Sequence, residues 1–354
     1  MAAVIAVLVV LAGAAAKSAV PRLLSTIRDK TQHAAPQPTL QARIPIPNAQ
    51  HVALYGNTAF VSDLDYAIRV VDLTTNAVVA DIPLGEHWYL ITGVFVDEQS
   101  HALVVVANDG ADRETVVLID LTSHQVTGTI PLGEDFASVA GFDPGLRTVY
   151  VGLTSDHHRN TALITADLDS RTVTGTLPLT KASGNIEVDP TTHRIYIPAN
   201  DEIAIVDGAT RTQTGTIATF ANAVAVDPQA RRLYATDRAT PNREEENTVL
   251  KIVDLDKGSV AATVPSGKMG FDVAVDTASG DAYVISGYST FLEDPGTVSE
   301  CDEGWVTRVD PDSESVTGTL CMDGSSLEMN AVVDPVLHRL YVAGGGPGLL
   351  VVNG

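Results

Sequence analysis

The sequence predicts an all-β fold: a seven-bladed β-propeller with four antiparallel strands per blade and a ring closed by the N-terminal strand. Three observations lead to this prediction. An Asp, usually followed by Pro, recurs after a short apolar run, and in five copies a Tyr follows seven residues later, as from Asp143 to Tyr150. A second apolar run ends in another Asp and precedes a Thr-rich run such as VTGTIPLG from Val126. None of the repeats shows the apolar periodicity of a helix.

Each repeat contains four short runs rich in Val, Ile, Thr and Tyr, separated by turn residues. The first Asp recurs at intervals of 38 residues (Asp189 to Asp227) to 58 residues (Asp276 to Asp334). Four short strands at this spacing are typical of propeller blades. Because one blade cannot cover both of its own faces, we expect the blades to stack in a ring.

The first 38 residues form a separate unit ahead of the repeats. Met1 to Ala16 is apolar and uncharged, no basic residue precedes it, and small residues end it. Sixteen helical residues span about 24 Å, less than the ~30 Å core of a bilayer. We expect a signal peptide or an uncleaved membrane anchor, followed by a linker, and hence a secreted or cell-envelope protein. A buried core helix is the alternative.

The two ends of the repeat region predict how the ring closes. The last copy has three runs, at 329–333, 339–343 and 349–352, and lacks a fourth. Near the start, Leu40 to Pro47 resembles the fourth run of other copies, such as VVADIPLG from Val78. We expect the N-terminal strand to complete the last blade and close the ring. The first and last blades are then not left unpaired. The propeller then spans residues 39–354.

The repeat also resembles that of a known family. The pattern Asp-Pro-x-x-x-Arg-x-Tyr, as in DPQARRLYATD and DPVLHRLYVAG, is followed by x-Val-Asp-x-x-Thr and a Thr-Ile-Pro-x-Gly end. This is similar to the YVTN-type (YncE-like) β-propeller repeat, although the YVTN segment itself is YATD, YIPA or YVAG here. The resemblance covers nearly the whole chain after residue 38. It implies the fold but no single function, since such propellers serve as binding platforms, surface-layer components and occasionally enzyme scaffolds.

Charge narrows the class of partner. The chain has 22 basic and 44 acidic residues and a net charge of −22. Phosphate and anionic lipid are repelled by such a charge, so we expect no nucleic-acid partner and membrane contact only through the N-terminal segment. The acidic residues that the repeat turns do not explain gather on one face, formed by the loops between second and third strands and between blades. We call it the top face.

The top-face loops also contain most of the candidate ligand-binding residues. Aromatic residues make up only 5% of the chain, yet several lie on these loops near histidines. With one histidine on an innermost strand, the candidates are His51, His87, Trp88, Tyr89, His157, His158, Tyr288 and Phe291. The sequence therefore predicts a binding platform with acidic top-face loops and a cationic protein or small-molecule ligand. The alternative is that the loops cover the channel mouth with a small core of their own.

The innermost strands contain a second candidate site. Glu187 is an acid among apolar residues in mid-strand, and burying an unpaired carboxylate is costly, so we expect it to face the wet channel or to find a partner. The candidate metal ligands are Asn185, Glu187, Asn222, Asp272 and Asn330. Oxygen ligands of this kind suit a hard cation such as calcium. Simple solvated polarity of the channel is the alternative.

A catalytic role has less support in the sequence. His51 and Asp272 would suit acid–base chemistry, but the chain contains no G-x-S-x-G elbow, no H-E-x-x-H motif and no phosphate loop. No catalytic residue is assigned, and the sequence favours a non-enzymatic role. A metal-assisted hydrolase or lyase at the channel mouth and a cell-envelope structural component are the alternatives to a binding platform.

The two cysteines predict one disulfide. Cys301 precedes the third strand of its blade and Cys321 ends the fourth. These strands are expected to pair as a hairpin around Asp312, which brings the cysteines together. In an exported chain such a bridge forms readily, and a loop of about 20 residues corresponds to ~3 kcal/mol of stabilisation. Two free buried thiols are the alternative.

Overall fold

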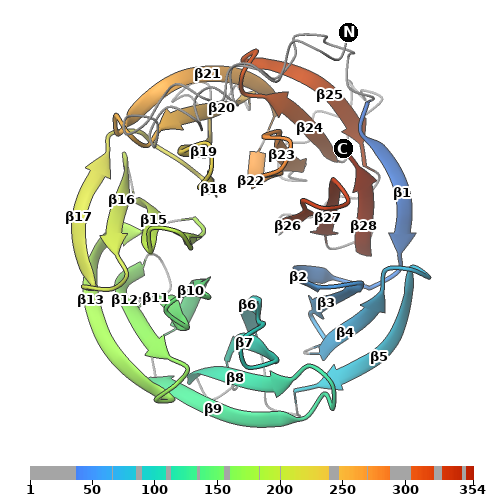
Figure 1. Ribbon diagram of the computed structural model, residues 1–354, viewed down its shortest axis with the longest axis vertical. Helices are drawn as coiled ribbons and strands as arrows, with labels where there is room; N and C mark the ends of the chain where they lie inside the picture. The colour runs from blue at the N-terminus through green and yellow to red at the C-terminus, as the bar shows by residue number, and fades with distance from the viewer. Residues whose placement is uncertain are drawn as a thin grey trace, which may run out of the picture. The chain divides into compact units, whose positions relative to one another are not determined.

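The structure, a computed structural model, describes residues 37–354 except 66, 85–89, 109–112, 134–135, 155–159, 183, 200, 239–246, 269, 288–303, 323–328 and 345–347. It confirms the seven-bladed β-propeller, with antiparallel strands arranged in blades around a central axis (Figure 1). Residues 37–354 form one compact unit. Within the ranges described, no helix is long and apolar enough to cross a membrane.

The first four blades follow one another along the chain, each from the axis outward. Blade 1 consists of β2 (Ala49–Tyr55), β3 (Thr58–Asp63), β4 (Ala67–Asp72) and β5 (Ala77–Pro83). Blade 2 consists of β6 (Leu90–Asp97), β7 (Ala102–Asn108), β8 (Glu114–Asp120) and β9 (Val126–Gly133). Blade 3 consists of β10 (Phe136–Asp143), β11 (Thr148–Thr154), β12 (Asn160–Asp167) and β13 (Thr172–Ala182). Blade 4 consists of β14 (Glu187–Asp189), β15 (Arg194–Ala199), β16 (Glu202–Asp207) and β17 (Thr212–Ile217).

The last three blades complete the ring. Blade 5 consists of β18 (Ala223–Asp227), β19 (Arg232–Arg238), β20 (Asn247–Asp254) and β21 (Ser259–Lys268). Blade 6 consists of β22 (Gly270–Val275), β23 (Ala282–Gly287), β24 (Gly304–Asp310) and β25 (Ser315–Cys321). Blade 7 consists of β26 (Met329–Asp334), β27 (Arg339–Gly344), β28 (Gly348–Asn353) and β1 (Thr39–Ile44).

Ring closure by the N-terminal strand is confirmed. β1 pairs antiparallel with β28, from Thr39 opposite Asn353 to Ile44 opposite Leu349. In Figure 1 the blue β1 forms the outer edge of the dark red blade that ends the chain. The seventh blade is therefore built from both ends of the repeat region.

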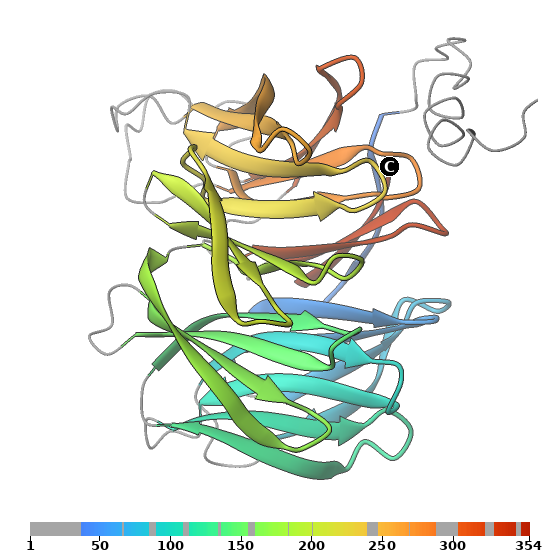
Figure 2. The same cartoon turned by 60° about the vertical axis from the view of Figure 1, so that its left-hand side comes forward.

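The apolar core is divided among the interfaces between blades. The described residues form seven buried clusters, and each of them joins two neighbouring blades, including blade 7 and blade 1. Figure 2 shows the twisted sheets stacked face to face. The recurring Tyr lies on the second strand and faces the next blade, as Tyr150 does between blades 3 and 4. Its burial follows from this position, because each blade is covered only by its neighbours.

The recurring Asp residues build the turns of the bottom face, opposite the top face. In the turn after β14, Asp189 accepts hydrogen bonds from the backbone N–H groups of Thr191 (2.9 Å) and Thr192 (3.3 Å). Four residues after the Asp, His193 has a left-handed backbone (φ 57°). Its Nδ1 lies 2.8 Å from Oδ2 of Asp143 in the preceding blade. The turn Asp thus also forms part of a contact between blades.

The same contact recurs around the ring. Arg147 reaches Asp97 at 2.8 Å, and His338 reaches Asp276 at 2.6 Å. Both residues also have positive φ. The left-handed turn aims these side chains across the interface, so one repeat position sets both the turn and the link to the preceding blade.

The outermost strand of every blade contains a register shift that marks a β-bulge. In the Thr-Gly-Thr segment of β9 the bulged residue is Thr127, whose carbonyl oxygen accepts a hydrogen bond from Arg171 of the next blade at 3.2 Å. A Cβ on Gly128 would lie 2.7 Å from that guanidinium. The glycine of this segment therefore makes room for the neighbouring blade, and the bulges interrupt what would be regular exposed sheet edges.

Candidate functional site

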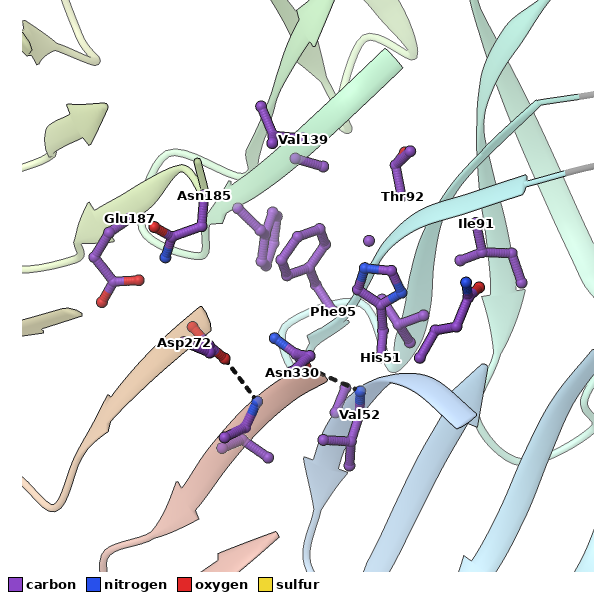
Figure 3. Close-up of a pocket in the computed structure, with 18 of the residues that line it drawn as sticks. His51, Val52, Ile91, Thr92, Phe95, Val139, Asn185, Glu187, Asp272 and Asn330 are labelled. Atoms are coloured by element: carbon purple, nitrogen blue, oxygen red, sulfur yellow. Dashed lines mark hydrogen bonds between the residues drawn. The ribbon is translucent and has the colours of Figure 1, made fainter. Parts of the chain in front are cut away.

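A cavity of about 730 Å³ lies on the axis of the ring. The innermost strands or the residues just before them line it in all seven blades, from His51 and Gly93 to Asp272 and Asn330 (Figure 3). An innermost strand has a neighbouring strand on one side only, so its other edge and the side chains near it are open to the axis.

Irregular strand starts direct one ring of side chains into this cavity. In blades 1, 2, 3 and 6 the innermost strand has a register shift near its beginning. The residue five places before the first repeat Asp, or before Tyr55 in blade 1, lies at or beside this shift. Residues at this repeat position line the cavity in these four blades, as Gln50, Thr92, Ser138 and Phe271, and also in blades 4 and 5, as Gly184 and Asn222. A β-bulge re-aims side chains next to a site in this way.

The next repeat position, four places before that Asp, connects blades across the channel wall. Asn185 accepts a hydrogen bond from the Val224 N–H at 2.8 Å and donates one to the Val224 carbonyl at 2.7 Å. Asn330 accepts one from the Val52 N–H at 3.1 Å. Both amides thus bind the otherwise open edge of the next blade's innermost strand, where unpaired backbone groups would be costly.

Two of the three carboxyl groups in the cavity lining, those of Asp272 and Glu187, use the same kind of contact. Oδ2 of Asp272 accepts a hydrogen bond from the Ala331 N–H at 2.9 Å, and Oε1 of Glu187 accepts one from the Val226 N–H at 3.0 Å. Figure 3 shows both side chains on the same side of the cavity, with Asn330 and Asn185 near them.

Burial controls the charge of these carboxyl groups. It raises the pKa of Glu187 to about 8, and the nearby Asp272 adds to the rise while the Val226 N–H opposes it. It raises the pKa of Asp272 to about 7, against the opposing hydrogen bonds from Ala331 and Val273. At neutral pH Glu187 is therefore mainly protonated and Asp272 is divided between its two forms.

His51 lies on the blade 1 side of the cavity and is neutral. Burial lowers its pKa to about 4. Its backbone N–H donates to Ser62 Oγ at 3.1 Å, and its Nδ1 lies 3.3 Å from the same oxygen. A neutral imidazole can donate or accept a hydrogen bond, but it adds no positive charge to the site.

Blades 2 and 3 give the other side of the cavity an apolar patch, beside Thr92, Ser138 and Glu98 of the same blades. Phe95, Val139 and Phe142 line it there, and the rings of the two phenylalanines are 6.1 Å apart. A Cβ on Gly93 would lie 2.8 Å from Cε2 of Phe95, so this glycine leaves space for the ring. The cavity is therefore two-sided, with aromatic and aliphatic groups facing amides and carboxyls.

The structure brings one of the two predicted sites together. All five candidate metal ligands and His51 line this single cavity. The other ligand-binding candidates lie outside the described residues: His87, Trp88, Tyr89, His157, His158, Tyr288 and Phe291. Cys321 ends β25, whereas Cys301 also lies outside the described residues, so the disulfide stays a prediction.

Neither the apolar side of the cavity nor most of the ring that begins with Gln50 and Thr92 is predicted from the sequence. Phe95 occupies a strand position where an apolar core residue is expected, so its residue type does not mark it as part of a site. The ring has a signal in the repeat alignment, since its members share one position and differ strongly in chemistry. Recognising it requires knowing that the strands bulge there.

The predicted metal site is neither confirmed nor contradicted by the structure. Among the described residues, no group of three or more His, Cys, Asp or Glu side chains is placed to hold a metal ion. The oxygens of Asn185 and Asn330 accept backbone hydrogen bonds. These residues therefore have a structural role whether or not a cation binds.

No protein-family model matches the chain, and a search of curated proteins finds no match. The similarity to YVTN-type repeats therefore stays a prediction from the residues quoted above. The strand order and the closed ring show the fold without it. The chain is identified as a seven-bladed β-propeller whose central channel contains a two-sided cavity.

Proposed function

We propose that this chain is an exported binding platform that takes its ligand in the central channel, with the acidic top-face loops as the surrounding recognition surface. The observation that supports the proposal is the two-sided cavity. Its volume of about 730 Å³ is in the range of small-molecule sites, which are largely apolar with a few fixed polar groups. The hydrogen bonds that hold Asn185, Asp272 and Asn330 to the next blade fix those polar groups before a ligand arrives.

The test fills the cavity with a side chain of the protein itself. Ser138 is exposed and lines the cavity, so Ser138→Trp is expected to occupy ligand space without disturbing the apolar core. Val79→Trp is the matched control, because Val79 is 60% exposed on the outer strand of blade 1. A library of cationic, neutral and anionic fragments is screened on all three proteins by ligand-detected NMR.

We expect fragments that bind the wild type and Val79→Trp but not Ser138→Trp, with all three proteins melting at similar temperatures. Fragments that bind equally to all three would contradict the channel as the ligand site. Export is tested separately by the N-terminal sequence of the protein recovered from the producing cells and their medium. A chain recovered only inside the cell with an intact N-terminus would contradict it.

An enzyme is the second candidate, because three titratable groups with perturbed pKa values, Glu187, Asp272 and His51, line one cavity. Such a set is typical of active sites. If the wild type hydrolyses a member of an ester, glycoside and phosphate substrate panel, then Glu187→Gln and His51→Ala should abolish turnover while the fold persists. Unchanged turnover in both variants would remove the channel as a catalytic site.

A further inference from the structure

We infer that the channel ligand is an organic ammonium ion with an apolar body, which binds at Glu187 and Asp272 by displacing a proton. The inference rests on the proposed function of the channel and adds the chemical class of the ligand.

The first step is the sign of the charge in the cavity. Its titratable lining residues are His51, Glu98, Glu187 and Asp272, and the described lining contains no Lys or Arg. Buried Asp189, at the end of β14, also acts on Glu187 and raises its pKa. Among the described lining residues no Lys or Arg balances the acids, and a cationic ligand is favoured over an anionic or zwitterionic one.

The second step is the position of the two carboxyl groups. Glu187 comes from blade 4 and Asp272 from blade 6, and blade 5 lies between them with Ala223 on the cavity wall. Glu187 accepts the Val226 N–H through one oxygen, and Asp272 accepts the N–H groups of Ala331 and Val273. A carboxylate has about four acceptor sites on two oxygens, so both groups retain acceptors for a ligand. An ammonium group with three N–H donors can use both.

The third step distinguishes an organic cation from a metal ion. Calcium takes six to eight oxygen ligands, whereas among the described residues no three His, Cys, Asp or Glu side chains are placed to hold a metal ion, and Phe95, Val139 and Phe142 occupy part of the wall. These side chains cannot replace the water around a metal ion. They suit an aromatic or aliphatic body, and an aromatic ring such as that of Phe95 also attracts a nearby cation through its face.

The fourth step is the proton balance. In the free protein at pH 6 burial keeps both carboxyl groups mainly protonated, because it raises the pKa of Glu187 to about 8 and that of Asp272 to about 7. An ammonium ion pairs with the carboxylate form. One cation therefore enters as one proton leaves for the buffer, and no covalent bond to carbon changes. Affinity must rise from pH 6 to pH 8.

Isothermal titration calorimetry on the whole chain tests this with 2-phenylethylammonium chloride as the probe. The neutral 2-phenylethanol and calcium chloride serve as comparison ligands. We expect the ammonium ion to bind at least about tenfold more tightly at pH 8 than at pH 6 and to release up to about one proton per site, measured from the dependence of the heat on the buffer. The alcohol should bind at least about tenfold more weakly at pH 8.

The variants separate charge from shape. Glu187→Gln and Asp272→Asn keep an oxygen for the backbone N–H, so we expect them to fold and to bind the ammonium ion at least about tenfold more weakly, with less proton release. Glu314→Gln removes an exposed acid of the same blade as Asp272, in the bottom-face turn between β24 and β25 and outside the cavity lining, and should leave binding unchanged.

Three outcomes would overturn the inference. Equal binding of the alcohol and the ammonium ion would show an apolar site without charge selection. Calcium binding that Glu187→Gln abolishes, with no ammonium binding, would show a metal site instead. No ammonium binding at about 10 mM, while the fragment screen finds ligands that Ser138→Trp excludes, would refute the ammonium class and leave the channel function standing. If Ser138→Trp excludes no ligand, the proposed function itself fails.

Discussion

Single polar side chains hold neighbouring blades together at the channel wall. Asn185 binds both backbone groups of Val224, and Asn330 and Asp272 each bind one backbone N–H of the following blade. These contacts satisfy an edge that no strand covers. They also explain why amides and acids occur where a core-facing pattern would place apolar residues.

Replacing Asn185 by Ala should destabilise the protein by about 1–3 kcal/mol, because the Val224 N–H and C=O both lose their partner. Asn222→Ala is the control, since Asn222 lines the same cavity and its side chain forms no hydrogen bond with the described residues. It should change stability by less than about 0.5 kcal/mol. Urea denaturation measures both, and an equal loss in the two variants would argue against the role of the Asn185 contacts.

The cavity acids make stability depend on pH in a direction that a surface acid would not. The folded protein keeps the Glu187 proton up to a pKa of about 8, whereas the unfolded chain releases it near pH 4.5. Stability therefore falls as pH rises through this window, by at most about 1.4 kcal/mol per pH unit for one proton. Asp272 contributes in the same direction up to about pH 7. His51, with its pKa lowered to about 4, acts oppositely, and only below about pH 6.5.

Glu187→Gln should therefore flatten the fall in stability between pH 6.5 and pH 8, where His51 does not contribute. Chemical denaturation at several pH values in this range measures it. A slope identical to that of the wild type would mean that Glu187 does not retain a proton in the folded state.

At the scale of strands and turns, one repeat position sets both conformation and contact. The residue four places after an Asp has a left-handed backbone in both hairpin turns, as His338 and His124 do. In the first turn of blades 3, 4 and 7 this residue reaches the Asp of the preceding blade, as from His338 to Asp276 at 2.6 Å. His124, in the second turn, has no such side-chain bond among the described residues.

His338→Asn should lower stability by about 1 kcal/mol, since Asn accepts the left-handed backbone but is too short to reach Asp276 as the imidazole does. The same substitution at His124 is the matched control and should be nearly neutral. Thermal melting at pH 7 compares them. Equal effects would show that the backbone conformation matters and the contact does not.

The glycine of the outer-strand segment can be tested at three equivalent positions. A Cβ on Gly215 would meet Ile205 at 3.9 Å, an ordinary contact. On Gly128 it would meet the movable Arg171 guanidinium at 2.7 Å, and on Gly318 the Pro38 ring at 2.3 Å. Substitution by Ala should be near neutral at Gly215, modest at Gly128 and cost about 1–3 kcal/mol at Gly318. A different order would contradict the packing role of this glycine.

The elements were predictable because their signals are local. Asp-Pro turns, the Tyr seven residues later and the missing fourth run of the last copy all lie within a few dozen residues. The bulges that aim Thr92 and Ser138 into the channel, and the pairing of Asn185 with Val224, depend on which strand ends up beside which. Phe95 was missed as a site residue because an apolar residue on a strand is chemically the same in a core and in a cavity wall.

At the scale of the whole molecule, stability depends on β1, the strand from the start of the repeat region that completes the last blade. β1 pairs with β28 and contributes Ile44, which is 1% exposed, to the core between blades 7 and 1. A chain that begins at residue 37 keeps this strand, and one that begins at residue 45 lacks it.

We expect the shorter chain to be destabilised by at least about 3 kcal/mol relative to the chain from residue 37, since it loses a buried side chain and a strand of backbone pairing. It should also self-associate through the uncovered edge of β28. Denaturation and sedimentation measure the two effects. Equal stability of the two chains would mean that the ring does not depend on its closing strand.

The closing contact between β1 and β28 also sets the order of events during synthesis. Residues near 40 must wait for residues near 350 before their edge is covered, so the ring cannot close before β28 has been synthesised. A protein emerging from the N-terminus onward therefore keeps β1 without its partner strand until residues 348–353 have emerged.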